Sequence, residues 1–193
     1  MLLSVSAEPT IPRPPGDAPE AAPATTLEGF LEAIAPRAFR FAELGLRHRE
    51  EALDAVQEAM LRMLGYRERP AEEWTPLFWR ILRTRVVDAQ RRRALRLRWL
   101  APSAPPGGED TAVDWPDPGP DPAGHHDARE AWARLADALA ALPRRQREAF
   151  TLRVLEDLDV ADTAKAMGCS EGSVKTHLSR AREALRRQLE DWQ

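Results

Sequence analysis

Apolar residues recur three and four positions apart through most of this chain, and this spacing predicts α-helices that each bury one face. Three such stripes occupy the first half, and the second of them ends near Gly65. The stripes are Leu27, Phe30, Leu31, Ile34, Ala38 and Phe41; Leu53, Val56, Met60 and Leu64; and Leu77, Phe78, Ile81, Leu82, Val86 and Ala89. The few strand-forming residues never alternate with a period of two, so we expect an all-α fold.

The second half continues the helical pattern. Its first stripe consists of Trp132, Leu135, Leu139 and Leu142. Pro143 is expected to start a new helix, because the first helical turn leaves its N–H groups unpaired in any case. Phe150, Val154 and Leu158 should carry that helix onward.

Residues 159–187 predict a short helix, a turn and a longer helix. Asp159 is a candidate N-cap for the short helix, and Ser170 is a candidate N-cap for the longer one. Gly168 lies between them and suits the turn, since glycine adopts a left-handed backbone conformation without steric cost. This arrangement is typical of a helix-turn-helix.

The longer helix of this motif has two different sides. Val174, Leu178, Ala181 and Leu185 should be buried, whereas Thr176, Ser179, Arg180 and Glu183 lie opposite them with Lys175 and Arg182 at the flanks. Small hydroxyls beside basic groups are suited to reading base edges in a major groove, where an arginine can donate two hydrogen bonds to guanine. The alternative is that these charges only solvate an amphipathic helix. The caps and the turn glycine favour nucleic-acid binding.

Proline placement divides the chain. Six of the 17 prolines fall in 9–23 and seven in 102–122. We therefore predict a disordered tail over 1–26, a helical domain over 27–100, a flexible acidic linker over 101–126 and a second helical domain over 127–193.

Charge is balanced overall but not locally, because 28 Lys and Arg face 31 Asp and Glu, while 80–98 holds eight arginines and a single acid. Such a basic segment can bind phosphates within an acidic chain. The lone cysteine, Cys169, excludes an internal disulfide and a multi-cysteine zinc site. No apolar run reaches the length of a membrane span. The sequence lacks a phosphate-binding glycine loop and a metal-ligand set, so we expect a cytoplasmic protein that is not an enzyme and has no cofactor.

A family resemblance becomes specific in the segment "LPRRQREAFTLRVLEDLDVADTAKAMGCSEGSVKTHLSRAREAL", which resembles region four of RNA polymerase sigma factors. The matching positions include Leu142 and Pro143, Gln146 and Arg147, Leu152 and Arg153, Ala164, Gly168, Gly172, Val174 and Lys175, 178–182 and Leu185. Thr163 departs from the family, which usually has a buried Ile there, and its hydroxyl could bond to a carbonyl of the preceding turn. Because "SVKTHL" also resembles luminescence-type regulator domains, this half alone leaves both families open.

The N-terminal half favours the sigma factors. The segment "EEALDAVQEAMLRML" resembles the region-two helix that docks on a coiled coil of the largest polymerase subunit. Its apolar stripe should face the domain core. The resemblance implies that Asp54, Gln57, Glu58 and Arg62 bind polymerase. An internally paired, solvated polar face is the alternative.

The next segment, "WTPLFWRILRTRVVDAQRRR", resembles the promoter-opening helix of the same family. By this resemblance, Trp79, Arg80, Arg83 and Arg91 would bind and melt minus-ten DNA. Arginines can hold phosphates, and an aromatic ring can stack on an unpaired base. For Trp79, the alternative is a position in the core. Leu77 and Thr84 depart from the family pattern.

Taken together, the motifs are identified as those of a short, two-domain extracytoplasmic-function (ECF) sigma factor. The resemblance implies core RNA polymerase, promoter DNA and an anti-sigma factor as partners, and no insertion into a membrane. It places Lys175, Thr176, Ser179, Arg180 and Arg182 on minus-thirty-five DNA, with Arg186 and Arg187 beside Arg182 on phosphates. A stand-alone helix-turn-helix regulator and a protein-binding helical scaffold remain the alternatives.

Overall fold

The computed structural model describes residues 26–100 and 122–190, and those residues form helices without any strand. The predicted all-α class is therefore confirmed. The elements are α1 (Leu27–Leu46), α2 (Arg49–Leu64), α3 (Ala71–Leu100), α4 (Pro122–Ala141), α5 (Arg144–Phe150), a π-helical turn (Thr151–Leu155), α6 (Val160–Met167) and α7 (Glu171–Glu190). The predicted disordered tail and most of the predicted linker lie outside the described residues. Helix α4 begins inside the segment predicted as linker, at Pro122.

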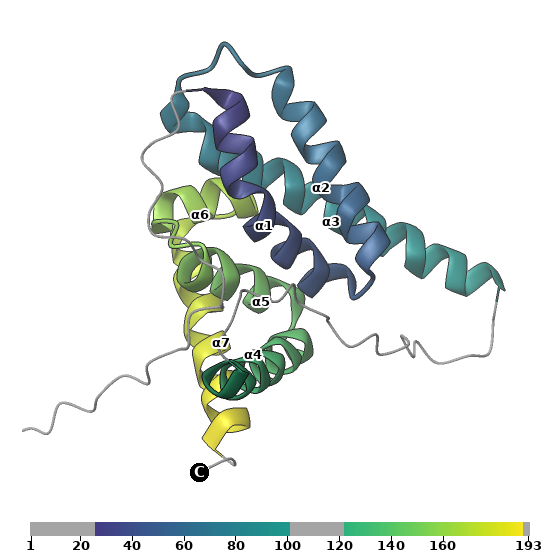
Figure 1. Ribbon diagram of the computed structural model, residues 1–193, viewed down its shortest axis with the longest axis vertical. Helices are drawn as coiled ribbons and strands as arrows, with labels where there is room; N and C mark the ends of the chain where they lie inside the picture. Colours follow the sequence, from purple (N-terminus) through teal and green to yellow (C-terminus); the bar gives the residue numbers. More distant parts are fainter. Residues whose placement is uncertain (1–25, 101–121, 191–193) are drawn as a thin grey trace, which may run out of the picture.

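Helices α1, α2 and α3 form the N-terminal bundle, in which each helix packs against the other two (Figure 1). Its centre is aromatic: Trp79 is fully buried, with its ring centroid 5.4 Å from that of Phe41 and 5.7 Å from that of Phe78. At the crossing of α1 and α3, a Cβ on Gly45 would stand 2.7 Å from Cγ1 of Val86. The Gln90 amide donates to the Gly45 carbonyl there, at 2.7 Å.

The core face of α2 differs from the prediction. The buried residues of this helix are Ala52, Ala55, Val56, Ala59 and Met63. Leu53 and Leu64, which were expected in the core, are 41% and 43% exposed. The helix is rotated so that small side chains face its neighbours, because alanines allow α2 to lie close to α1 and α3. That part of the prediction was wrong.

The C-terminal half follows the predicted order with one change. Pro143 precedes α5 as expected, but the helix does not continue regularly to Leu158. It widens into the π-helical turn and ends at Glu156, so Leu158 lies in the connection to α6. A π-helical turn inserts one extra residue per turn and thereby shifts the side chains that follow it.

The two halves, predicted as separate domains, pack against each other in this structure (Figure 1). Helix α6 lies on α3, and α4 contacts α1. Leu158 and Met167 belong to the same apolar cluster as the N-terminal core, while Leu44 of α1 belongs to the cluster built around Trp132 and Leu139. No helix within the described ranges has both the length and the apolar character needed to cross a membrane.

Candidate polymerase and promoter interfaces

The outward side of α7 is held in place by caps and a turn that the sequence predicted. The Asp159 carboxylate accepts the N–H of Asp162 at 2.7 Å, and the Ser170 hydroxyl accepts the N–H of Ser173 at 3.2 Å. Gly168 has a φ of 61°, in the left-handed region. The helix-turn-helix is confirmed.

Helix α7 is buried on the side that the sequence predicted. In α6, the residue that departs from the family pattern, Thr163, has a hydrogen-bond partner for its hydroxyl. Val174 is buried in the same apolar cluster as Ala164 and Met167 of α6. Ala181 and Leu185 are buried, and Leu178 is half-buried, in the other cluster, which contains residues of α4 and α5. Thr163 is also buried, and its hydroxyl donates to the Asp159 carbonyl at 2.6 Å, as the sequence suggested. A threonine therefore replaces the usual aliphatic residue without leaving a buried hydroxyl unpaired.

The predicted DNA-reading residues of α7 share one exposed surface. Lys175, Thr176, Ser179, Arg180 and Arg182 are all exposed, and we call them the α7 surface. The Thr176 hydroxyl donates to the Gly172 carbonyl at 2.9 Å, so its lone pairs remain able to accept from a base. The arrangement offers two basic forks and two hydroxyls from one helix, which suits a major groove.

Two half-buried arginines of α5 connect the helices of the C-terminal half. Arg145 donates to the Met167 carbonyl at 2.8 Å and thereby binds the end of α6 to α5. Arg147 donates to the Ala140 carbonyl at 3.0 Å, and burial lowers the pKa of its guanidinium. Arg147 is one of the positions that match the family motif, and its contact joins α5 to the end of α4.

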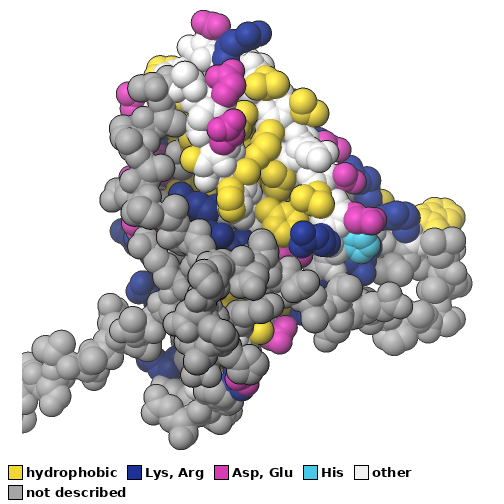
Figure 2. All heavy atoms as spheres, in the orientation of Figure 1, with side chains coloured by type: hydrophobic (Ala, Val, Ile, Leu, Met, Phe, Trp, Pro, Cys, Tyr) yellow, Lys and Arg dark blue, Asp and Glu magenta, His cyan; other side chains and the backbone are white. Residues whose placement is uncertain are grey.

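The predicted polymerase-binding residues of α2 are exposed together. Asp54, Gln57, Glu58 and Arg62 all lie outside the bundle core. Sequence reasoning missed the exposed leucines beside them, which are Leu53, Leu61 and Leu64. We call these seven residues the α2 surface, and Leu61 is its most exposed leucine, at 68%. Figure 2 shows hydrophobic side chains gathered on the face that carries α1 and α2.

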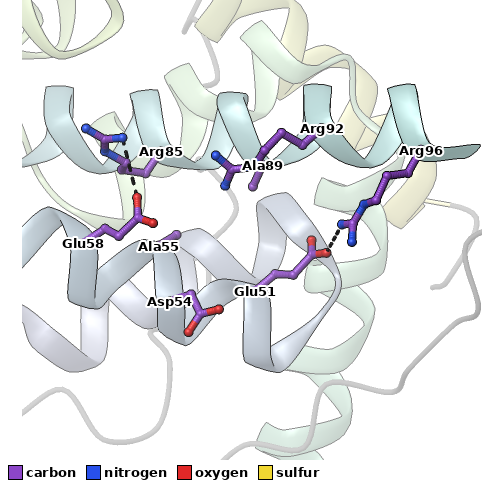
Figure 3. A pocket seen from close by; sticks show the side chains of 8 residues that line it. All are labelled: Glu51, Asp54, Ala55, Glu58, Arg85, Ala89, Arg92 and Arg96. Carbon is purple, nitrogen blue, oxygen red and sulfur yellow. Dashed lines mark hydrogen bonds and ion pairs between the residues drawn. The ribbon is translucent and has the colours of Figure 1, made fainter.

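One edge of the α2 surface continues into a charged cavity of about 220 Å³ between α2 and α3. Glu58 and Glu51 reach from α2 towards arginines of α3 (Figure 3). Glu58 pairs with Arg85 at 3.5 Å, and Glu51 pairs with Arg96 at 3.0 Å. Glu58 is therefore paired across the two helices, while 51% of its side chain stays exposed. Among the residues that the structure describes, no ion pair is formed by Asp54.

The four residues predicted to bind minus-ten DNA do not form one surface. Arg80 and Arg91 are exposed, whereas Trp79 is completely buried against Phe41 and Phe78. Trp79 cannot stack on an unpaired base in this conformation, so its placement at the edge of the basic face was wrong. Arg83 is withdrawn from solvent by a different cause, since it pairs with Glu148 of α5.

Comparisons with known proteins relate this chain to RNA polymerase sigma factors. The family described as Sigma-70, region 4 matches residues 132–185. The ECF RNA polymerase sigma factor BldN of Streptomyces coelicolor is 48% identical to this chain over 59 residues, which make up 31% of this chain and 22% of BldN. The ECF RNA polymerase sigma factor SigC of Mycobacterium tuberculosis is 30% identical over 162 residues, which cover 82% of this chain and 80% of SigC.

A solved structure shares the fold. The sigma factor RpoE from Bartonella quintana, crystallised with the anti-sigma factor NepR, superposes with a TM-score of 0.66 at 22% sequence identity. The match covers 86% of this chain and 98% of RpoE. The likeness in fold therefore extends over most of both chains.

Proposed function

Because this chain belongs to the ECF RNA polymerase sigma factors, we propose that it binds core RNA polymerase through the α2 surface and reads promoter DNA with both halves. Sigma factors are initiation subunits, and the family is not one of enzymes. The observation that carries the proposal is the presence of two exposed surfaces of different chemistry on α2 and α7. We infer that the chain acts in the cytoplasm, without catalytic activity of its own.

The composition of the α2 surface favours a protein partner over DNA. Three exposed leucines lie beside Asp54 and Glu58, and carboxylates repel the phosphate backbone. Apolar groups that are exposed side by side on one helix are typical of a protein interface. We therefore add Leu53, Leu61 and Leu64 to the proposed polymerase-binding residues.

For promoter DNA, we assign the α7 surface to the minus-thirty-five element. Arg180 is exposed beside Thr176 and Ser179 and is the candidate for a bidentate contact with guanine. Arg182, Arg186 and Arg187 follow it along exposed positions and suit phosphates. In α3, we retain Arg80, Arg83 and Arg91 as phosphate contacts near the minus-ten element and remove Trp79.

We also propose an anti-sigma factor as a partner. RpoE is named in complex with such a protein. A partner of this kind would cover the α2 surface and prevent polymerase from docking, because apolar patches on a free subunit otherwise remain open to other proteins.

Core polymerase freed of sigma factor provides the direct test. The purified chain should form a stable complex with it and start transcription at a defined promoter. Leu61→Glu should weaken the complex about tenfold or more, because it places a charge in an apolar contact. Leu189→Glu is the matched control, since Leu189 is 42% exposed on α7, away from the α2 surface. A wild-type chain that binds promoter duplex but never core polymerase would support a stand-alone regulator instead.

A further inference from the structure

The contact between the two halves contains one ion pair that is buried on both sides and a second whose arginine is half-buried. Nε of Arg83 in α3 donates to Oε2 of Glu148 in α5 at 2.9 Å, and the two side chains are only 13% and 7% exposed. Nε of Arg37 in α1 donates to Oε2 of Glu156 at 2.6 Å, and the Glu156 side chain is 2% exposed. In each pair an arginine of the N-terminal half holds a carboxylate of the C-terminal half.

Glu148 is the centre of a larger group of charges. Its carboxylate lies 3.5 Å from a guanidinium nitrogen of Arg144 and 3.8 Å from one of Arg145, both on its own helix. One buried carboxylate therefore offsets three guanidinium groups. Removing its charge would leave these cations close together, and it would leave Arg83, which is 13% exposed, without a counter-charge in a place that little water can reach.

Arg83 cannot serve two partners at once. Its Nε points to Glu148, and with 13% of the side chain exposed a phosphate cannot approach the guanidinium in this arrangement. The residues of the α7 surface, in contrast, are all exposed in the same arrangement. The packing of the halves thus covers one proposed DNA contact and leaves the other open.

We propose that the Arg83–Glu148 pair is a latch that holds the two halves together and keeps Arg83 from DNA until the halves separate. The latch rests on the proposed function, because only that function gives Arg83 a DNA partner. It makes Glu148 a regulatory residue although Glu148 belongs to neither proposed interface. The latched chain can still present the α7 surface to duplex DNA, but it cannot use Arg83 to hold an opened strand.

Energy transfer between two dyes on the full-length chain, without polymerase, tests the latch. Glu50→Cys in α2 and Gln188→Cys in α7 provide exposed labelling sites in a Cys169→Ala background. Glu148→Gln should raise the population with separated halves on the order of tenfold or more, because it leaves Arg83 buried without a counter-charge. The matched control is Glu130→Gln, which removes a carboxylate that pairs with Arg134 within α4 and should change nothing.

Arg83→Met tests the same pair from the other side. It leaves Glu148 paired with Arg144 and Arg145 on its own helix, and it should also separate the halves. Helix content, followed by circular dichroism, distinguishes separation from unfolding. Unchanged energy transfer in both variants would overturn the latch. Loss of helix content in both would overturn it as well, because the pair would then belong to the fold itself.

A second measurement separates the latch from the proposed function. With core polymerase and promoter DNA, Glu148→Gln should open the minus-ten region faster than the wild type in permanganate footprinting. If the wild type fails to bind polymerase while Glu148→Gln still separates the halves, the proposed function is wrong and the latch stands. If the wild type opens promoters and the halves of Glu148→Gln stay together, only the latch is wrong.

Discussion

Helices α3 and α7 both carry rows of basic residues, but they present them differently. Arg180 and Arg182 of α7 are exposed, whereas Arg83 of α3 is almost enclosed by its pairing with α5. The difference follows from what lies against each helix. Glu148 of α5 pairs with Arg83 and α6 packs on α3, whereas no described residue covers the outward side of α7. A row of arginines in a sequence therefore indicates a basic helix, while the packing around that helix decides which charges can reach DNA.

The largest expected effect concerns the tryptophan between these basic residues of α3. Trp79→Ala should lower the free energy of unfolding by about 3 to 5 kcal/mol, because it opens a large cavity in the aromatic core. Urea unfolding followed by circular dichroism measures the loss. Trp99→Ala is the control on the same helix, and it should change stability by less than about 0.5 kcal/mol because Trp99 is 82% exposed.

A different result for Trp79→Ala would contradict the difference between α3 and α7 described above. If Trp79→Ala kept wild-type stability and lost only promoter opening, Trp79 would be a DNA contact after all. The outward side of α3 would then resemble that of α7.

An intermediate effect is expected on the α7 surface. Arg180→Ala should cost about 1 to 3 kcal/mol of binding free energy on a preferred promoter and little on a sequence changed at the contacted base. Fluorescence anisotropy of the polymerase complex on the two DNA sequences measures both values. Arg187→Ala is the comparison, since a phosphate contact should weaken binding to both sequences alike. Equal losses for Arg180→Ala on the two sequences would make it a phosphate contact.

The smallest effect concerns the turn that positions α7. Gly168→Ala should cost about 1 to 2 kcal/mol of stability, because a φ of 61° is unfavourable for any residue with a Cβ. No neighbouring atom lies within 4 Å of the added carbon, so the loss would be purely conformational. Gly172→Ala, inside α7, should instead stabilise the chain by about 0.5 to 1 kcal/mol. Equal changes in urea unfolding would contradict this explanation.

The local features of the fold could be predicted because neighbouring residues determine them. Asp159, Gly168 and Ser170 set the limits of α6 and α7 through caps and a left-handed turn, and all three act as expected. The exposure of the α7 surface followed from helical periodicity alone. The hydroxyl of Thr163 also bonds within its own helix, so a sequence argument could anticipate it.

Features that depend on distant residues could not be predicted in this way. Two faces of helix α2 carry apolar residues. The face with the smaller side chains, Ala52, Ala55 and Ala59, is buried because the neighbouring helices lie too close for leucines. Of the predicted stripe, Val56 is buried and Met60 packs against the core, whereas Leu53 and Leu64 face outward. The Arg83–Glu148 pair joins residues 65 positions apart, and no local pattern connects them.

The close crossing of α1 and α3 at Gly45 should not depend on ionic strength. The crossing of α1 and α3 at this glycine depends on van der Waals contact with Val86 and on a neutral hydrogen bond from Gln90. Neither contact changes with ionic strength, whereas association with a polyanion weakens steeply as salt is added. The crossing of α1 and α3 should therefore keep its geometry at salt concentrations that strongly change binding to nucleic acid, whereas the ion pairs between α2 and α3 are open to screening.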